Sequence, residues 1–278
     1  FQAGGRLDGS GVAFPVARGF KLLLCCRFFP GLLPIDCFVL EASQPDRYSR
    51  TPLTQRDAMT PTQKTFSPVD GSLLVERPRA DAETLHQILE RARNAQTAWR
   101  QTSLDERIRL LRAMVAAFVA NKEAIAEEIT RQMGRPLRYA GGEVDGFADR
   151  AHTMLDLAPT ALANMMPPAQ DGFERYVQRE PLGVVLCLAP WNYPYLTAVN
   201  AIVPALAAGN TLVLKHSAQT PLCAERIQQA MEAAGVPPGV FQTVHCSHDA
   251  VATMVADPRV DFVAFTGSVE GGEAVSRA

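Results

Sequence analysis

Residues 181–215 read PLGVVLCLAPWNYPYLTAVNAIVPALAAGNTLVLK, and this stretch decides the fold. It contains 34 consecutive residues (181–214) without a charged side chain. Prolines and asparagines divide it into pieces too short to span a bilayer, which takes about 20 uninterrupted apolar residues. The pattern is instead typical of a strand, a turn, a helix and a second strand, all buried in an α/β core.

Four short apolar runs predict strands at residues 184–188, 211–214, 240–244 and 261–265. Helical segments separate these runs. The order strand, helix, strand predicts an α/β fold with a doubly wound, parallel Rossmann-like sheet over residues 184–278. Ligands of such sheets bind at the carboxyl ends of the strands. The candidate functional residues are therefore those that directly follow each run.

The preceding region, residues 80–166, is predicted to be helical. Apolar side chains follow Asp81 at alternating steps of three and four, which form one face of a helix: Leu85, Ile88, Ala92, Ala95 and Trp99. A capping box at Ser103 begins a second helix that we expect to continue to Gly134. A third helix is expected from about residue 142 to residue 164, before two prolines.

Residues 171–183 connect the helical region to the sheet. Within them, residues 176–180 (YVQRE) combine polar and apolar side chains before a Pro-Leu-Gly turn. This composition predicts a short strand that forms part of an exposed arm.

Asn192 follows the first predicted strand, in the sequence APWNYP (residues 189–194). Pro190 and Pro194 restrict the backbone on either side of it, so this rigid turn directs one amide side chain into the crevice. A carboxamide there can donate hydrogen bonds to a developing oxyanion without carrying charge. The alternative is that Asn192 only caps the following helix, a common role of asparagine.

Lys215 follows the second predicted strand, and residues 216–218 read HSA. A lysine at the end of a buried strand is costly unless an anionic or hydroxyl-rich group, such as a ribose or a phosphate, meets it. The alternative is that its ammonium group extends to solvent.

Residues 266–272 follow the last predicted strand and read TGSVEGG. Glycines at a strand-to-helix turn leave backbone N–H groups available to a phosphate at the helix N-terminus. The spacing is neither GxGxxG nor that of a P-loop, so an ordinary glycine-rich turn is the alternative.

Composition and charge narrow the class of protein. The 278 residues are 47% hydrophobic and 20% charged, with 27 Lys and Arg against 29 Asp and Glu, for a net charge of −2. This is a globular composition, and the lack of basic excess argues against nucleic acid as a partner. No segment predicts a membrane span.

The six cysteines form no CxxC pair, which predicts reduced thiols in a cytoplasmic protein rather than a zinc ribbon or a disulfide framework. His245-Cys246-Ser247-His248 suggests a Cys–His hydrolase or a metal site as a minor alternative. Neighbouring residues on a strand point to opposite faces, and no acidic group supports the cluster. We therefore expect no metal.

Residues 1–58 differ from the rest of the chain. They hold six of the 13 phenylalanines, carry a net charge of +2 against −4 for residues 59–278, and precede Met59. Their apolar stretch is too interrupted for a membrane span or a signal peptide. We expect them to be an upstream extension outside the functional fold.

Taken together, the three strand ends resemble the aldehyde dehydrogenase superfamily. The resemblance covers about residues 64–278 and is carried by residues 190–194, Lys215 and residues 265–268, with a family-like connector GVPPGVF at residues 235–241. In that family, a cysteine thiolate attacks an aldehyde, a hydride passes to a nicotinamide cofactor, and the resulting thioester is hydrolysed to the acid.

The resemblance implies a role for each candidate residue. Asn192 would donate to the oxyanion of the thiohemiacetal, and the residues that would bind NAD or NADP are Pro190, Trp191, Lys215, Ser217, Thr266, Gly267, Ser268 and Gly272. The arm would be an oligomerisation element, which implies a homodimer or homotetramer. The substrate would be a small-molecule aldehyde.

The sequence departs from the family pattern in two places. In the first, the family's frequent Lys-Pro-Ser/Ala-Glu is here Lys215-His216-Ser217-Ala218. The missing Glu removes a carboxylate that repels the 2′-phosphate of NADP. We therefore expect the use of both cofactors, and His216 hints at a succinate-semialdehyde-type branch.

The family's general-base Glu and nucleophilic Cys lie after the Phe-Thr-Gly-Ser turn, and none of the six cysteines stands in the nucleophile's context. We expect residues 59–278 to be the cofactor-binding part without the catalytic domain, inactive alone. The alternative is a non-catalytic nucleotide-binding or oligomerisation module.

Overall fold

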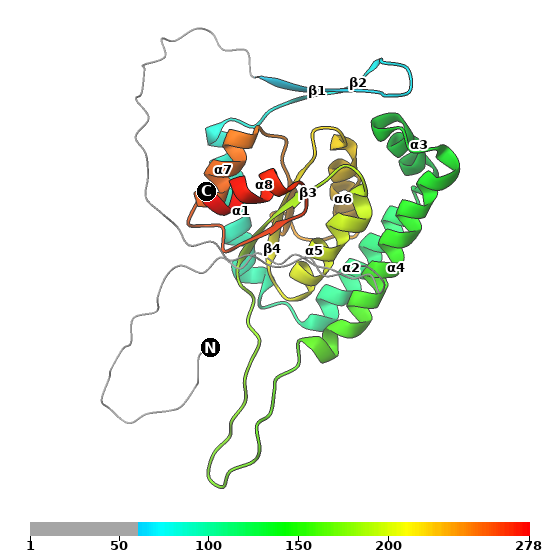
Figure 1. The fold of residues 1–278 in the computed structure, drawn as a ribbon. Helices are drawn as coiled ribbons and strands as arrows, with labels where there is room; N and C mark the ends of the chain where they lie inside the picture. Colours follow the sequence, from blue (N-terminus) through cyan, green and yellow to red (C-terminus); the bar gives the residue numbers. More distant parts are fainter. Residues whose placement is uncertain (1–60) are drawn as a thin grey trace, which may run out of the picture.

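A computed structural model describes residues 61–278, and Figure 1 shows their arrangement. The expectation of a separate extension at residues 1–58 lies outside these described residues. So do Cys25, Cys26 and Cys37.

A four-stranded parallel sheet forms the centre of the molecule. Its strands are β3 (Val184–Ala189), β4 (Thr211–His216), β5 (Phe241–Thr243) and β6 (Phe262–Phe265), in the order β5-β4-β3-β6. All neighbouring pairs are parallel. The predicted α/β fold is confirmed, and each predicted strand is present with small shifts at its ends.

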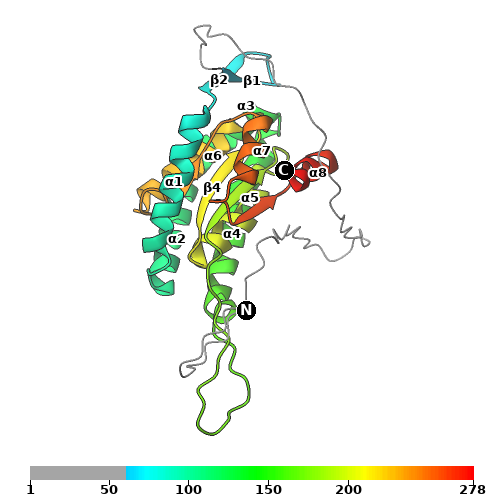
Figure 2. The same cartoon turned by 90° about the vertical axis from the view of Figure 1, so that its left-hand side faces the viewer.

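Helices cover both faces of this sheet, as the all-buried pattern of β3 predicts (Figures 1 and 2). Val184, Leu186 and Leu188 pack in one apolar cluster with α1 (Ala82–Trp99) and α7 (His248–Ala256). The alternate residues of β3 pack in the other cluster, with α5 (Pro194–Ala207) and α6 (Pro221–Ala233). Period-two alternation along β3 therefore separates two cores.

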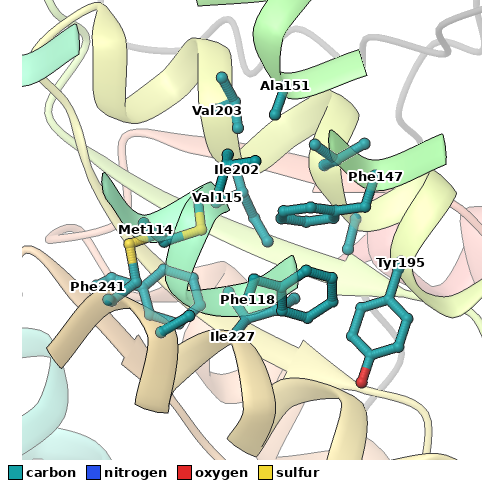
Figure 3. Close-up of a cluster of buried hydrophobic side chains, with 14 of the residues drawn as sticks. Met114, Val115, Phe118, Phe147, Ala151, Tyr195, Ile202, Val203, Ile227 and Phe241 are labelled. Atoms are coloured by element: carbon teal, nitrogen blue, oxygen red, sulfur yellow. The ribbon is translucent and has the colours of Figure 1, made fainter. Parts of the chain in front are cut away.

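A second helical layer packs outside α5 and α6. It consists of α2 (Leu104–Val119), α3 (Lys122–Met133) and α4 (Leu137–Ala161). Figure 3 shows its junction with α5, where Phe118, Phe147 and Tyr195 make tilted and edge-on ring contacts with centroids 4.5–6.3 Å apart. These rings hold the N-terminal turn of α5 against α2 and α4.

The prediction of one continuous helix from Ser103 to Gly134 was wrong. Ser103 does cap α2, because its hydroxyl accepts a hydrogen bond from the Glu106 N–H. The helix ends at Ala120, and Asn121 leaves the helical conformation before α3 begins. The apolar face continues across the break, so periodicity alone could not reveal it. The next helix begins at Leu137, earlier than predicted, and takes two glycines into its first turns.

Residues 162–182 leave the body as a long arm that runs out and back (Figures 1 and 2). The predicted strand at residues 176–180 is absent. The backbone of the arm pairs with itself at two isolated bridges, Met165 with Val177 and Gln170 with Phe173. The physical reason is that, within the described residues, no neighbouring strand continues the ladder that a strand needs.

The remaining elements are a hairpin of β1 (Thr62–Phe66) and β2 (Leu73–Pro78) and the last helix, α8 (Val269–Arg277). Within residues 61–278, no helix has both the length and the apolar character that crossing a membrane requires.

Candidate functional site

A cleft of about 600 Å³ lies at the carboxyl edge of the sheet. Its floor comes from the ends of β3, β4 and β6, and its walls from α7 and α8. The predicted residues that line it are Pro190, Trp191, Asn192, Lys215, Ser217, Thr266, Gly267 and Ser268. Gly272 is not among the lining residues, whereas Gly271 is. A volume of this size is typical of small-molecule sites.

Asn192 lies in the turn between β3 and α5. The N-cap residue of α5 is Tyr193, without a side-chain cap bond, so Asn192 does not cap the helix. Its Oδ1 accepts a hydrogen bond of 3.0 Å from the Tyr193 N–H. Within the described residues its Nδ2 has no hydrogen-bond partner, so this N–H group is available to a ligand in the cleft.

Lys215 is held inside the protein near the end of β4. Its relative exposure is 9%, so most of the side chain is buried, and the residue lines the cleft. Burial lowers its pKa, and the like charge of Arg79 lowers it further, against an opposing effect of the Cys246 thiol. A largely buried lysine that also feels the charge of another cation favours an anionic ligand.

Arg79 is a second cation that acts electrostatically on Lys215, and it is not among the residues that line the cleft. Its Nε is buried and, among residues 61–278, has no hydrogen-bond partner. A buried guanidinium N–H without an acceptor is costly unless a ligand supplies one. No local pattern in the sequence identifies Arg79, because the residue lies in the connection between β2 and α1, more than 100 positions before Lys215.

The turn before α8 brings backbone close to the cleft. The Ser268 side chain caps α8 by accepting a hydrogen bond of 3.1 Å from the Gly271 N–H. A Cβ added at Gly267 would lie 2.6 Å from the Phe265 ring, and one at Gly271 would lie 2.9 Å from it. A side chain at either position would therefore force the Phe265 ring to shift.

Two neighbouring helix N-termini are already occupied by side chains. Glu143 accepts hydrogen bonds from the first turn of α5, and Gln132 accepts one of 2.9 Å from the Leu222 N–H at the start of α6. By contrast, α8 is capped only by its own Ser268 and borders the cleft. Its N-terminus can receive a phosphate group.

Comparison with known proteins agrees with this geometry. A model of the aldehyde dehydrogenase family matches residues 55–278. The chain belongs to the aldehyde dehydrogenase family. The resemblance inferred from the three strand ends is confirmed.

Several named relatives of this aldehyde dehydrogenase chain are known. Succinate semialdehyde dehydrogenase (NAD(P)+) Sad of Escherichia coli (strain K12) is 33% identical over 217 residues, which cover 76% of this chain and 45% of the relative. The solved structure of succinic semialdehyde dehydrogenase from Streptococcus pyogenes in complex with NADP+ is 31% identical, with a TM-score of 0.72, and the match covers 77% of this chain and 47% of that chain.

The structure of aldehyde dehydrogenase from Brucella melitensis biovar abortus 2308 is also 31% identical, with a TM-score of 0.74. That match covers 78% of this chain and 45% of that chain. The aldehyde dehydrogenase chain described here thus spans less than half the length of each of these relatives.

The described thiols of this aldehyde dehydrogenase chain are poor nucleophiles. Cys187, Cys223 and Cys246 are buried and unpaired. Burial raises the pKa of Cys187 to about 12 and also raises the pKa of Cys223 and of Cys246. A thiolate is the reactive form, so none of the three is poised to attack a carbonyl.

The alternative site at residues 245–248 is not assembled. His245 bonds the Glu225 carboxylate at 3.0 Å, Cys246 packs in the apolar core, and Ser247 caps α7. In the part of the chain that the structure describes, no group of three or more metal-ligating side chains exists. The cleft is also lined by His248, Val251 and Val255 of α7. These residues lie on a helix and do not follow a predicted strand, so the strand ends alone do not identify them.

Proposed function

We propose that this chain provides the cofactor-binding part and the oxyanion-stabilising asparagine of an NAD(P)-dependent aldehyde dehydrogenase. The proposed reaction oxidises a small-molecule aldehyde to a carboxylic acid through a cysteine thiohemiacetal and a thioester. The observation that carries the proposal is one cleft that gathers the Asn192 amide, the buried Lys215 and the N-terminus of α8. These groups suit a carbonyl oxygen, a ribose and a pyrophosphate.

The cleft fits a nicotinamide dinucleotide. Lys215 provides a cation in the cleft for the adenosine end, and the charge of Arg79 acts on Lys215. The N–H groups at the start of α8 would receive the pyrophosphate, while Trp191 and Pro190 form the wall toward Asn192. When bound, the nicotinamide supplies the hydride acceptor.

Cofactor choice is proposed to include NADP. Residues 216–218, which follow Lys215, are His, Ser and Ala, so no acidic side chain occupies these positions to repel a 2′-phosphate. The charge of Arg79, which acts on Lys215, favours a dianion over an uncharged hydroxyl. Relatives with NADP in their names support the same proposal.

Asn192 is proposed to stabilise the developing oxyanion. Its Oδ1 is engaged by the Tyr193 N–H, which orients Nδ2 as the available donor. An uncharged amide in this position stabilises the negative oxygen by donating an N–H hydrogen bond without giving up its proton.

The nucleophile and the general base are proposed to lie outside residues 61–278. The described thiols are buried with raised pKa values, which supports this part of the proposal. The same observation favours one alternative, a non-catalytic nucleotide-binding or oligomerisation module. Reading the gene downstream of codon 278 distinguishes the two: a Glu-Leu-Gly-Gly motif followed by a cysteine supports the enzyme, and a stop codon supports the module.

Homo-oligomerisation through the arm is also proposed. The arm exposes large apolar side chains, namely Met165, Met166, Phe173, Tyr176, Val177 and Leu182. Such a concentration on one projection is typical of an interaction surface. The buried, unpaired thiols support the proposed reducing, cytoplasmic location.

Titration of the protein with NAD and NADP, followed by Trp fluorescence, tests the proposal. Trp191 is half-exposed in the cleft, whereas Trp99 is buried in the core, so a cofactor that enters the cleft changes the Trp191 emission. Nicotinamide reduction with a panel of aldehydes, including succinate semialdehyde, then tests the reaction. Absence of saturable binding of both dinucleotides would rule out the proposed site.

A further inference from the structure

We propose that Arg135 and Glu143 are positioning residues for Asn192, which they hold in place from the side of α4. The inference rests on the proposed function in that Asn192 is taken as the oxyanion donor. Neither residue lines the cleft. Both act on the turn that carries Asn192.

Glu143 closes the N-terminus of α5. It is fully buried on α4, and its Oε2 accepts hydrogen bonds from the N–H groups of Tyr195 at 3.2 Å and Leu196 at 3.1 Å. The first residue of α5 is Pro194, which has no N–H group, so these are the first two backbone donors of the helix. A carboxylate at a helix N-terminus also interacts favourably with the helix dipole.

Arg135 connects this carboxylate to the Asn192 turn. Its Nη1 donates to the Glu143 Oε1 at 2.7 Å, and its Nη2 donates to the backbone carbonyl of Asn192 at 3.1 Å. The guanidinium also lies over the Tyr193 ring, 4.8 Å from its centroid. The planar fork of one arginine therefore fixes the backbone of Asn192 relative to a buried carboxylate.

His216 holds the same turn from the side of β4. Its ring lies 3.2 Å from the Pro194 carbonyl through Nε2, while Nδ1 accepts a hydrogen bond from the Ser217 N–H. The acceptor role of Nδ1 places the proton on Nε2, which donates to Pro194. The turn is thus held at Asn192 by Arg135 and at Pro194 by His216.

These contacts matter because Asn192 has little support of its own. It is exposed, and the only hydrogen bond of its side chain within the described residues is the one from the adjacent Tyr193 N–H. The direction of its Nδ2 therefore follows the backbone of the turn. Arg135 is the side chain that sets this backbone from outside.

The test observes the side-chain amide of Asn192 directly. Selective ¹⁵N-asparagine labelling of the protein yields six side-chain NH₂ pairs, from Asn94, Asn121, Asn164, Asn192, Asn200 and Asn210. The substitution Asn192→Ala assigns the relevant pair by its loss. The variant Arg135→Met keeps the apolar stem and removes both hydrogen bonds.

The matched control is Arg138→Met. Arg138 stacks on Tyr139 at 4.5 Å as Arg135 stacks on Tyr193, but it is exposed and has no contact with the Asn192 turn. We expect Arg135→Met to shift and broaden the Asn192 pair, with the Asn94 and Asn121 pairs unchanged. We expect Arg138→Met to leave all six pairs in place. An unchanged Asn192 pair in Arg135→Met overturns the proposal.

A second variant distinguishes the loss of positioning from misfolding. Arg135→Lys retains the charge beside Glu143 but cannot bond both Glu143 and the Asn192 carbonyl through a rigid fork. We expect it to unfold at the same denaturant concentration as the wild type and still shift the Asn192 pair. The proposal fails if this folded variant retains the wild-type Asn192 signals.

Addition of NADP to the wild type keeps the two proposals apart. A response of the Trp191 indole signal supports the proposed function, and its absence contradicts that function alone. The effect of Arg135→Met on the Asn192 pair in the absence of cofactor is read in either case.

Discussion

The N-termini of α5 and α8 lie beside the same cleft, but their backbone N–H groups have different partners. At α5, the fully buried Glu143 accepts the first backbone N–H groups, and Arg135 balances its charge. At α8, only Ser268 caps the helix, and close-packed glycines surround it. Both termini carry the same partial positive charge. The protein uses one internally, to hold a turn, and leaves the other available for a ligand.

From this difference we infer that the α5 terminus contributes to the stability of the fold and the α8 terminus to ligand binding. Substitutions at the α5 terminus are expected to affect folding and the geometry of Asn192. Substitutions near the α8 terminus and Lys215 are expected to affect ligand affinity with less effect on folding.

Glu143→Ala should produce the largest loss of stability. It removes a buried carboxylate and leaves Arg135 and the α5 N–H groups unpaired, which costs about 3–5 kcal/mol. Urea unfolding measures this loss. Glu127→Ala, on the exposed face of neighbouring α3, should change the free energy of unfolding by less than about 0.5 kcal/mol. Equal losses in the two variants would contradict the role of Glu143.

Asn192→Ala should lower the turnover number for aldehyde oxidation by about 100- to 1000-fold. The reason is the loss of one donor to the oxyanion. Steady-state kinetics in the catalytically complete enzyme measures this loss, with the unfolding midpoint as the control. A turnover number within about twofold of the wild type would exclude the proposed role of Asn192.

The burial of His216, which contacts the first residue of α5, should make the free energy of unfolding depend on pH. Burial lowers its pKa to about 4, partly opposed by the bond to the Pro194 carbonyl, whereas an unfolded histidine titrates near 6.5. Between these values the unfolded chain binds more protons. The free energy of unfolding therefore falls as pH falls from about 6.5 to about 4, by roughly 3 kcal/mol.

The variant His216→Gln should lack this contribution. Its unfolding free energy, measured between pH 7 and pH 4 beside the wild type, should fall less steeply in that window. Parallel curves for the two proteins would show that His216 is not the titrating group.

Lys215→Met should weaken NADP binding by roughly 10- to 100-fold, because a hydrogen bond to a charged group contributes about 1.5–3 kcal/mol.

Arg79→Met should weaken binding of NADP more than that of NAD, since only NADP carries the 2′-phosphate. Calorimetric titration with each cofactor measures both effects. Lys122→Met is the control, because Lys122 is paired with Asp145 on the helical layer. An equal loss for NAD and NADP in Arg79→Met would place Arg79 outside the 2′-phosphate site.

Ser268→Ala should have the smallest effect. Loss of an N-cap hydroxyl costs about 1 kcal/mol, and backbone N–H groups of α8 remain for the ligand. Thermal unfolding and NAD titration together check this expectation. A loss of stability as large as that of Glu143→Ala would remove the contrast between the two helix termini.

Much of the site could be predicted from residues that lie next to one another in sequence. Asn192 and Ser268 each follow a strand of the sheet, and Lys215 is the penultimate residue of β4. Parallel strands bring their carboxyl ends to one edge. The break between α2 and α3 could not be predicted, because the apolar period continues through Asn121. The strand expected in the arm is absent because a strand needs a paired neighbour, and the backbone of the arm pairs with itself at isolated bridges alone.

The amino-acid sequence by itself determined the doubly wound sheet, the strand-end residues and the family to which the chain belongs. Apolar periodicity and turn residues are local properties that indicate the sheet and its strand ends, and the motifs at those strand ends carry the resemblance to the family. Only the tertiary structure decided that the charge of Arg79 acts on Lys215 and that Arg135 and Glu143 reach the Asn192 turn. These groups come from distant parts of the chain. No local pattern encodes their contacts, because packing of the helices against the sheet creates them.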